Sequence, residues 1–308
     1  MRMDVLEPLR DRIFAALAHG DEDAARAGIE ELRAHAPVEA AGLLTALHIE
    51  AGRVDEALAA WQTCAMGAPE DAYTIFLRAR IHVMEKAWTK ALDLLAPLFQ
   101  HAIAPAVAEK VYNLAGQCAR VLGRPAEAVA FYEQARDAAP DLMLRALNAS
   151  NVLFNRHYLP APPAEDRRAA EEYGALFAGV QPFDHGKRKR RKRRLRIGYL
   201  SPDVREHVVL SFSYALMTAL DPARFEVYVY AVNAEDDFTQ KVRASVDVFR
   251  NLRNFSAGEA AHVIHRDGID ILVDLAGHTT GSLLPILAYR PAPVQISGIG
   301  YFASTGLP

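Results

Sequence analysis

The spacing of apolar residues changes once along the chain and divides it into two parts. Over residues 1–155, apolar residues recur at helical spacing in sequence rich in Ala, Leu, Glu and Arg, without strand-like alternation. From Leu195 onward, short runs rich in β-branched and aromatic residues alternate with helical stretches. We therefore predict a helical domain at 1–155, a linker at 156–194 that includes one more helix, and an α/β domain at 195–308.

The helical domain contains an internal repeat. Two copies share one order of a Gly, an Ala, an aromatic residue and a Pro: Gly52, Ala57, Trp61 and Pro69, then Gly123, Ala128, Tyr132 and Pro140. Weaker copies centre on Ala25 and Ala91. A small Ala allows two antiparallel helices to approach, an aromatic ring fills the space between repeats, and Gly and Pro end helices. The pattern resembles the tetratricopeptide repeat (TPR), whose period is 34 residues.

A TPR solenoid offers a concave surface that binds an extended peptide or another protein. We expect this use for residues 1–155, with a protein or peptide acceptor as the partner. Two alternatives remain open: the solenoid orients the following domain, or it forms a dimer surface that makes the protein a homo-oligomer. Trp61 and Tyr132 are interpreted as packing residues in either case.

Five predicted strands alternate with helices in the second part, which indicates a parallel, Rossmann-like sheet with helices on both faces. The strands are expected at 195–201, 225–232, 248–253, 270–276 and 293–300. Ligands of such sheets bind at the carboxyl ends of the strands. Polar and flexible residues follow the first, fourth and fifth of these strands. We therefore expect a site at this edge of the sheet.

Composition narrows the class of protein. Hydrophobic residues make up 51% of the chain, enough for ordinary globular cores, and no apolar run approaches the ~18 residues of a membrane span. The N-terminal sequence lacks the apolar segment of a signal peptide. The two cysteines, Cys64 and Cys118, show neither disulfide nor zinc-binding spacing. We expect a cytoplasmic protein without a structural metal and without membrane association.

The net charge of −3 hides one strongly basic segment. Residues 187–196 hold nine of the 35 Lys and Arg residues, so the rest of the chain is acidic. Such a run is typical of a solvated linker, and also of nucleic-acid attachment or a nuclear import signal. No interleaved aromatic residue and no nucleic-acid-binding motif accompanies it. We therefore favour the linker over a nucleic-acid site.

Four segments of the second part resemble the opening of the catalytic region of O-GlcNAc transferases, including the plant SPINDLY type. They are RLRIGYLSPDVREHVVLSF at 194–212, RFEVYVYA at 224–231, DGIDILVDLAGHTTGSLL at 267–284 and YRPAPVQISGIGYFASTGLP at 289–308. Their order behind TPR-like repeats agrees with that family. The resemblance implies the first lobe of a two-lobed GT-B fold. It also implies transfer of N-acetylglucosamine from UDP-GlcNAc to Ser or Thr of proteins, with inversion and without a metal or other cofactor.

The resemblance places His207 on the family histidine of a D-x-x-x-H motif, which is described as a catalytic base or a positioning group. A hydroxyl nucleophile needs a proton acceptor that titrates near neutral pH, which suits an imidazole. Asp203, four residues earlier, is then placed to orient the ring. The alternative is a histidine that only begins a helix. Val204 and Val208 stand where the family has Phe and Pro.

Further candidates for substrate binding lie along the same edge. They are Gly277, His278, Thr279, Gly281, His265 and Tyr301. Glycines in the Gly-His-Thr-Thr-Gly loop allow close approach of the backbone to a sugar or phosphate, and Thr279 can donate a hydrogen bond. Tyr301 either lines the cleft or packs beneath it. His265, on the helix before the loop, is either a site residue or an inert surface histidine.

In the family a second lobe follows, with the UDP-binding pocket and a lysine that offsets the charge of the leaving diphosphate. The sequence to Pro308 contains no P-loop, no GxGxxG motif after a strand and no second series of strands and helices. We therefore expect residues 1–308 alone to be inactive, and to bind UDP-GlcNAc only together with such a lobe. The alternative function is a non-catalytic TPR adaptor whose α/β domain binds a partner or stabilises the solenoid.

Overall fold

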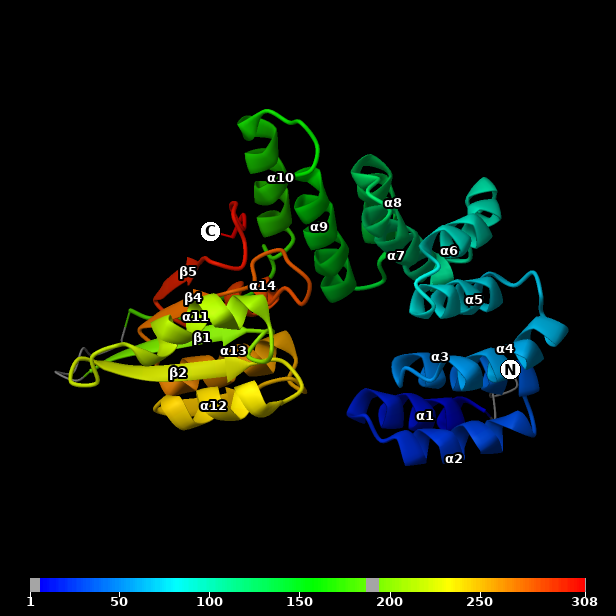
Figure 1. Cartoon of the computed structure of the whole chain (residues 1–308), viewed down its shortest axis with the longest axis horizontal. Coiled ribbons are helices and arrows are strands. Elements are labelled where there is room, and N and C mark those ends of the chain that lie inside the picture. The colour runs from blue at the N-terminus through cyan, green and yellow to red at the C-terminus, as the bar shows by residue number, and fades with distance from the viewer. Residues whose placement is uncertain (1–5, 187–193, 308) are drawn as a thin grey trace. The chain divides into compact units, whose positions relative to one another are not determined.

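The computed structural model describes residues 6–186 and 194–307, and the chain divides into two compact units, Met1–Pro140 and Asp141–Pro308 (Figure 1). The first unit is built from helices, and the second from a sheet with helices around it. Most of the predicted basic linker, residues 187–193, lies outside the described residues. No described helix has both the length and the apolar character that crossing a membrane requires.

The first unit is a series of helix pairs. Its helices are α1 (Glu7–His19), α2 (Glu22–Arg33), α3 (Pro37–Glu50), α4 (Val54–Gly67), α5 (Ala72–Met84), α6 (Trp88–Leu95), the short 3₁₀ helix η1 (Ala96–Gln100), α7 (Pro105–Val121) and α8 (Pro125–Ala138). From α1 to α8, each odd-numbered helix packs on the even-numbered helix that follows it. This is the arrangement that the repeated sequence predicts.

The alanine that recurs in every repeat lies at the contact between paired helices. All four copies are completely buried: Ala25, Ala57, Ala91 and Ala128. A longer side chain at this position would hold the two helices apart, because protein interiors are close-packed. The aromatic position also packs inward. Tyr132 is buried, and its ring fills the space left by Gly116 in α7, where a Cβ atom would lie 2.8 Å from the ring.

The turn inside each repeat needs a residue in the left-handed backbone conformation. Gly20, Gly52 and Gly123 adopt φ angles of 71°, 74° and 72°, five residues before the buried alanine. The third copy lacks this glycine, and Lys86 takes its place with a φ of 58°. For a residue with a Cβ atom, this conformation costs about 1 kcal/mol of free energy. The third repeat therefore keeps the backbone conformation of the turn, although its sequence lacks the glycine.

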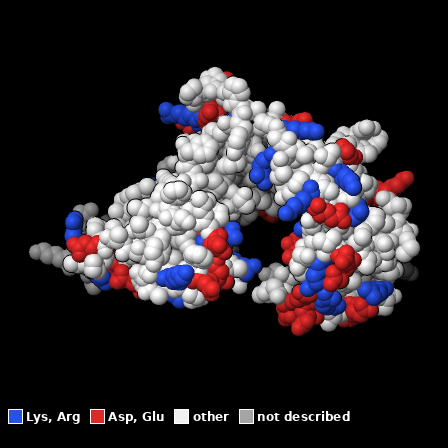
Figure 2. All heavy atoms as spheres, viewed as in Figure 1, with Lys and Arg blue, Asp and Glu red and all other residues white. Residues whose placement is uncertain are grey.

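Polar contacts also join neighbouring repeats. The Trp61 indole N–H donates to the Thr74 carbonyl oxygen at 2.9 Å, and Arg10 pairs with Glu39 at 2.7 Å. Figure 2 shows basic and acidic side chains interspersed over the surface of this unit, at the lower right of the view. Exposed ion pairs contribute at most about 1 kcal/mol each. The buried helix contacts therefore supply most of the cohesion.

The second unit contains a five-stranded parallel sheet with the strand order β3-β2-β1-β4-β5. Its elements are α9 (Leu142–Arg156), α10 (Pro163–Ala175), β1 (Leu195–Ser201), α11 (Val208–Thr218), β2 (Phe225–Ala231), α12 (Asp237–Ser245), β3 (Val248–Asn251), α13 (Ala257–Asp267), β4 (Ile271–Asp274), α14 (Leu284–Leu287) and β5 (Val294–Ser297). Each predicted strand is present. The predicted fold class, helical repeats followed by a parallel α/β unit, is confirmed.

Two cores cover the two faces of this sheet. On one face, Tyr199 of β1 packs in a cluster with Met217 of α11 and Val242 of α12. On the other face, Leu200 of β1 packs in a cluster with Ile264 of α13. Neighbouring residues of β1 therefore face opposite cores, as expected for a strand that is buried on both sides.

Helix α9 belongs to the core of the second unit, although its sequence groups it with the repeats. Its residues Ala146 and Leu153 are buried in the same cluster as Leu200 of β1 and Tyr173 of α10. The compact unit accordingly starts at Asp141, ahead of the segment that we predicted to be a linker. The helix expected in that linker is α10, which packs beside α9.

Candidate functional site

The strand order changes direction between β1 and β4, and this point defines where a ligand is expected. The chain moves outward from β1 to β3 and then crosses back to β4. In open parallel sheets, ligands bind in the crevice outside the carboxyl ends of the strands at such a switch point. The loops after β1 and β4 approach each other there, because a Cβ atom at Gly281 would lie 3.1 Å from Pro202. The candidates Asp203 and His207 follow β1.

The segment after β2 holds the loop after β1 in place. The Val204 N–H donates to Asn233 Oδ1, and the Val204 carbonyl oxygen accepts from Asn233 Nδ2, both at 3.1 Å. Thr239 Oγ1 donates to the same carbonyl oxygen at 2.7 Å. The Val204 side chain is completely buried in the core beneath the loop. The valine at the expected Phe position therefore still anchors the loop.

His207 is the N-cap residue of α11, and its ring faces two partners. The Nδ1 atom lies 3.3 Å from the Val209 backbone nitrogen and 3.6 Å from Asp203 Oδ2. The Asp203 side chain is only 10% exposed and also lies 3.5 Å from the Arg205 guanidinium. Val208 occupies the first helical position, where proline is favoured but not required. The Asp203–His207 pair is thus present without the expected Pro.

The two partners of Nδ1 favour opposite tautomers of His207. A bond from the Val209 N–H leaves the ring proton on Nε2, whereas a bond to Asp203 needs the proton on Nδ1 and leaves Nε2 free to accept another. Both contacts are longer than ordinary hydrogen bonds. Catalytic contacts often tighten only when the substrate is bound. Asp203 is therefore placed to select the tautomer in which Nε2 is a base.

A pocket of about 680 Å³ opens beside His207. Its walls come from the loop after β1, the first turns of α11 and the start of α12. Arg205 and Lys241 supply positive charge and Glu206 supplies negative charge. Tyr214 and Phe238 supply aromatic surface. Small-molecule sites typically combine such apolar walls with a few polar groups. Among the described residues that line this pocket, His207 is the one predicted site residue.

The carboxylate of Asp274, at the end of β4, organises the loop that follows this strand. It is completely buried and accepts hydrogen bonds from Ser297 Oγ at 2.7 Å, the Gly277 N–H at 2.8 Å and the Ala276 N–H at 3.1 Å. Burial raises the pKa of Asp274, and the three donors partly offset this effect. We did not select Asp274 as a candidate from the sequence, although an Asp at the end of a predicted buried strand can be recognised there.

Gly277 and Tyr301 pack directly against each other. Gly277 has a φ of 55°, and a Cβ atom there would collide with the Tyr301 side chain. The Tyr301 hydroxyl lies 2.6 Å from Nε2 of His157, the C-cap residue that follows α9. Burial raises the pKa of Tyr301 to about 12. Of the two alternatives for Tyr301, its 7% exposure favours packing beneath the cleft.

Both ring nitrogens of His278 bond to other parts of the chain. Nε2 lies 3.0 Å from the Thr305 carbonyl oxygen, so it must carry the proton, and Nδ1 then accepts from Ser150 Oγ at 2.9 Å. The ring is 1% exposed and meets the Tyr173 ring edge to face, with 4.5 Å between centroids. Burial lowers the pKa of His278 to about 4. In this structure His278 therefore links α9, α10 and the C-terminal segment as a neutral ring.

The remaining two candidates lie in different places. Thr279 is in the loop after β4, and its hydroxyl donates to the Ala276 carbonyl oxygen at 2.8 Å. His265 lies in the last turn of α13, at the opposite, amino edge of the sheet, with its ring stacked on Phe183 at 4.1 Å between centroids. The structure therefore brings the other candidates to one edge and leaves His265 apart. The roles of all these residues in substrate binding stay predictions.

Comparison with known proteins supports the resemblance seen in the sequence. Residues 176–308 match the sequence profile of glycosyl transferase family 41. A probable UDP-N-acetylglucosamine–peptide N-acetylglucosaminyltransferase SPINDLY of Arabidopsis thaliana is 38% identical over 122 residues, and the UDP-N-acetylglucosamine–peptide N-acetylglucosaminyltransferase of Caenorhabditis elegans is 35% identical over 133. The predicted similarity to the O-GlcNAc transferase and SPINDLY family is confirmed.

The matches cover different shares of this chain and of the similar proteins. The alignments cover 38% and 42% of this chain, but only 13% and 12% of the two relatives. A solved structure of a mutant O-GlcNAc transferase from Thermobaculum terrenum matches all of this chain with a TM-score of 0.59 and 24% identity, and the chain spans 53% of that structure. This likeness shows a shared fold of helical repeats and parallel sheet.

Proposed function

We propose that this protein is a UDP-GlcNAc–protein O-glycosyltransferase and that its second unit forms the acceptor side of the active site. The Asp203–His207 pair carries the proposal, because it lies at the switch point of the sheet beside a pocket of about 680 Å³. Both residues also fall within the match to glycosyl transferase family 41. The names of the similar plant and nematode proteins state N-acetylglucosamine transfer to peptides, and we extend this activity to the present protein.

In the proposed reaction, a Ser or Thr hydroxyl of the acceptor attacks C1 of N-acetylglucosamine. The new C1–O bond forms on one face while the bond from C1 to the diphosphate oxygen breaks on the other, so the configuration inverts and UDP leaves with the electron pair. Nε2 of His207 takes the hydroxyl proton. The Asp203 carboxylate accepts a hydrogen bond from the Nδ1–H group and stabilises the imidazolium that results. No metal ion takes part in this proposal.

We further propose that the helical unit presents protein substrates and other partners. A pocket of about 440 Å³ in this unit is lined by α3, α4 and the end of α2, with Arg33, Leu44 and His48 among its residues. Helical-repeat proteins use such concave surfaces to hold extended segments. A cytoplasmic location, the absence of a cofactor and the inactivity of residues 1–308 alone stay predictions.

The test measures transfer kinetics with the protein expressed in full from its own gene, UDP-GlcNAc and an acceptor peptide. Replacing a general base costs about 10²–10⁴-fold in rate, so His207→Ala is expected to lower kcat by this factor. Asp203→Asn is expected to lower kcat more than it changes KM, and to alter the acid side of the pH–rate profile. His262→Ala is the matched control, because His262 is an exposed histidine of α13 that does not line the pocket beside His207. Its ring contacts the Gly258 carbonyl oxygen of its own helix and the Phe183 ring.

Two results would count against the proposal. Unchanged kcat in His207→Ala would remove this residue from the reaction. Peptide binding without any binding of UDP-GlcNAc, measured by calorimetry on the same protein, would favour the TPR adaptor instead.

A further inference from the structure

The loop between β1 and α11 carries His207 and is held unevenly along its length. Asn233 bonds both backbone groups of Val204, and His207 begins α11. Arg205 and Glu206 lie between these two points, and both are exposed. Within the described part of the chain, the N–H of Glu206 makes the one backbone hydrogen bond of these two residues. The acceptor of this bond therefore determines how the backbone enters His207.

The acceptor is the carboxylate of Asp236, the N-cap residue of α12. Its Oδ2 atom accepts from the Glu206 N–H at 2.7 Å, and its Oδ1 atom accepts from the Thr239 N–H at 2.8 Å. The bond from Glu206 is the largest of the effects that hold the pKa of Asp236 below its usual value. Hydrogen bonds to an ionised acceptor are stronger than those between neutral groups. One side chain thus joins the loop before α11 to the first turn of α12.

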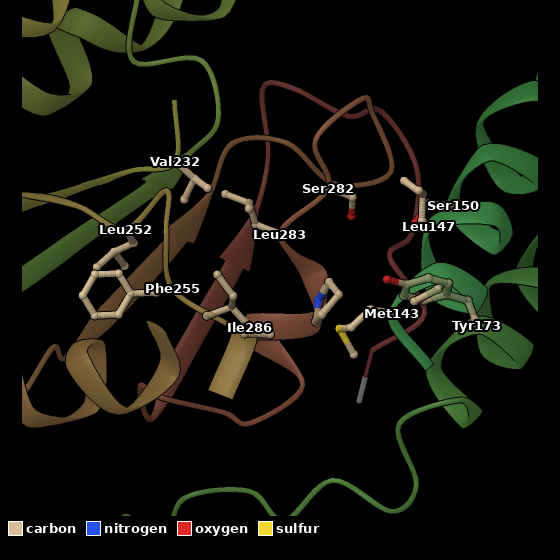
Figure 3. A pocket seen from close by; sticks show the side chains of 13 residues that line it. Met143, Leu147, Ser150, Tyr173, Val232, Leu252, Phe255, Ser282, Leu283 and Ile286 are labelled. Carbon is tan, nitrogen blue, oxygen red and sulfur yellow. The ribbon is translucent and has the colours of Figure 1, made fainter. Parts of the chain in front are cut away.

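The segment that carries Asp236 is itself anchored on the sheet. It begins at Val232, whose N–H donates to the Ser201 carbonyl oxygen, at the end of β1, at 3.0 Å. The Val232 side chain lies on the opposite face of the sheet from His207, in a pocket that Leu283 also lines (Figure 3). Asp236 therefore fixes the loop before α11 against a segment that the sheet holds in place.

The Asp203–His207 pair depends on this bond for the position of one partner. Asp203 is 8% exposed, and its N–H donates to Ser201 Oγ at 3.0 Å, so it stays with β1. The contacts of the His207 ring are longer, at 3.6 Å to Asp203 Oδ2 and 3.3 Å to the Val209 nitrogen. Contacts of this length do not fix the ring by themselves. The backbone at Glu206 therefore sets the distance between the two groups.

The same bond joins two walls of the pocket beside His207. Glu206 belongs to one wall, and Phe238, two residues after Asp236, belongs to the other. We propose that Asp236 is a positioning residue of the transfer reaction, which keeps His207 in reach of Asp203 and of an acceptor in this pocket. This inference rests on the proposed function.

The alternative is that Asp236 only caps α12. Asp141 caps α9 in this way, because its carboxylate accepts from the Leu144 N–H at 2.9 Å and bonds no other loop in the described part of the chain. Serine is also a favoured N-cap residue, but its side chain is shorter. Asp236→Ser therefore keeps the bond to Thr239 and loses the bond to Glu206. Asp141→Ser is the matched control, since it changes a cap alone.

The first experiment measures transfer kinetics of the protein expressed in full from its own gene. Because a displacement of about 1 Å can cost 10²-fold in rate, Asp236→Ser is expected to lower kcat about 10–100-fold. The KM for the acceptor should change far less, because the serine cap holds α12 and its wall of the pocket in place. Asp141→Ser is expected to keep the wild-type kcat.

The second experiment follows hydrogen exchange of the backbone amides at 204–210 in the absence of substrate. This segment should exchange faster in Asp236→Ser than in the wild type, because the Glu206 N–H and its neighbours lose their anchor. Exchange in β1 and β2 should stay unchanged, which shows that the variant is folded. Asp141→Ser should match the wild type at 204–210. Equal exchange of this segment in Asp236→Ser and the wild type would overturn the proposal.

The third experiment separates positioning from a general structural role. A residue that acts through His207 costs little once His207 is absent. Adding Asp236→Ser to His207→Ala should therefore lower the remaining rate by no more than about 2–3-fold. An equal loss of rate from Asp236→Ser in both backgrounds would show that Asp236 acts without His207, and the proposal would be wrong.

These outcomes are distinct from a failure of the proposed function. Wild-type kcat in Asp236→Ser, together with an impaired His207→Ala, would overturn the positioning role and leave the transfer reaction standing. A wild-type protein without any transfer activity would overturn both, and this is established before any variant is compared.

Discussion

The buried ring of His278 should make the second unit lose stability in mild acid. Burial lowers the pKa of His278 to about 4 from an ordinary value of 6.5, and repulsion from the nearby His157 acts in the same direction. The unfolded chain therefore binds a proton at a higher pH than the folded chain does. The stabilising contribution is present above pH 6.5 and is lost as the pH falls toward 4.

The size of this effect follows from the pKa difference. At about 1.4 kcal/mol for each tenfold change in proton binding, His278 contributes roughly 3 kcal/mol in full, and about 2 kcal/mol of this is lost by pH 5. Asp274 acts in the opposite sense, because burial raises its pKa and its contribution is lost as the pH rises. The two effects must be separated by comparing variants, since a pH profile of the wild type alone contains both.

The assay is urea unfolding between pH 7.5 and 5, measured for the wild type and for His278→Gln. Both tryptophans, Trp61 and Trp88, lie in the first unit, so fluorescence does not report on the second. The methyl signal of Met217, a buried residue of α11, is a suitable probe. His278→Gln is expected to be less stable at pH 7.5, and its unfolding free energy should fall by about 2 kcal/mol less than that of the wild type on going to pH 5.

Two results would refute this account of the His278 ring. Titration of the His278 ring signals near pH 6.5, or parallel pH profiles for the two proteins, would show that the ring is neither buried nor bonded as described. NMR should also find the proton of the neutral ring on Nε2, because that nitrogen faces a carbonyl oxygen. A proton on Nδ1 would contradict the proposed direction of the bond from Ser150.

Three further predictions test the fold. Lys86→Gly should stabilise the helical unit by about 1 kcal/mol, because Lys86 has a φ of 58°; tryptophan fluorescence during urea unfolding measures this. Gly116→Ala should destabilise the same unit by about 1–2 kcal/mol in the same assay, because its Cβ atom would press on the Tyr132 ring, and Tyr132→Leu should relieve much of the loss. Asp274→Ala removes the acceptor of three hydrogen bonds, so we expect a loss of about 3 kcal/mol or more and faster hydrogen exchange at the Gly277 amide. If one of these variants had the same free energy of unfolding as the wild type, the structural feature on which that prediction rests would be contradicted.

The sequence predicts those parts of the fold that local periodicity determines. Helical spacing and the recurring alanines locate the repeats, and short β-branched runs locate the strands, because both patterns record which side of an element is buried. The left-handed backbone conformation of Lys86 could not be predicted from the residue type. The packing of the helices on either side requires a left-handed residue, and this constraint acts whichever residue occupies the turn.

Tertiary contacts decide the remaining points. The helical spacing of α9 shows that one side of it is buried, but not that the sheet rather than a repeat buries it. Gly-His-Thr-Thr-Gly is a polar loop in sequence, and only the positions of Ser150 and Thr305 show that His278 is enclosed by the chain. His265 precedes this loop in sequence, yet the helix that carries it ends at the other edge of the sheet. The Asp203–His207 pair was predictable because four residues of spacing keep both groups in one loop.

The most direct test of the central claim is the mass of acceptor proteins before and after incubation with UDP-GlcNAc and the protein expressed from its own gene. The proposed function predicts the addition of N-acetylglucosamine at Ser or Thr hydroxyls, together with far less addition by His207→Ala and undiminished addition by His262→Ala. An acceptor mass that stays unchanged with the wild-type protein, or addition by His207→Ala at the wild-type rate, would contradict it.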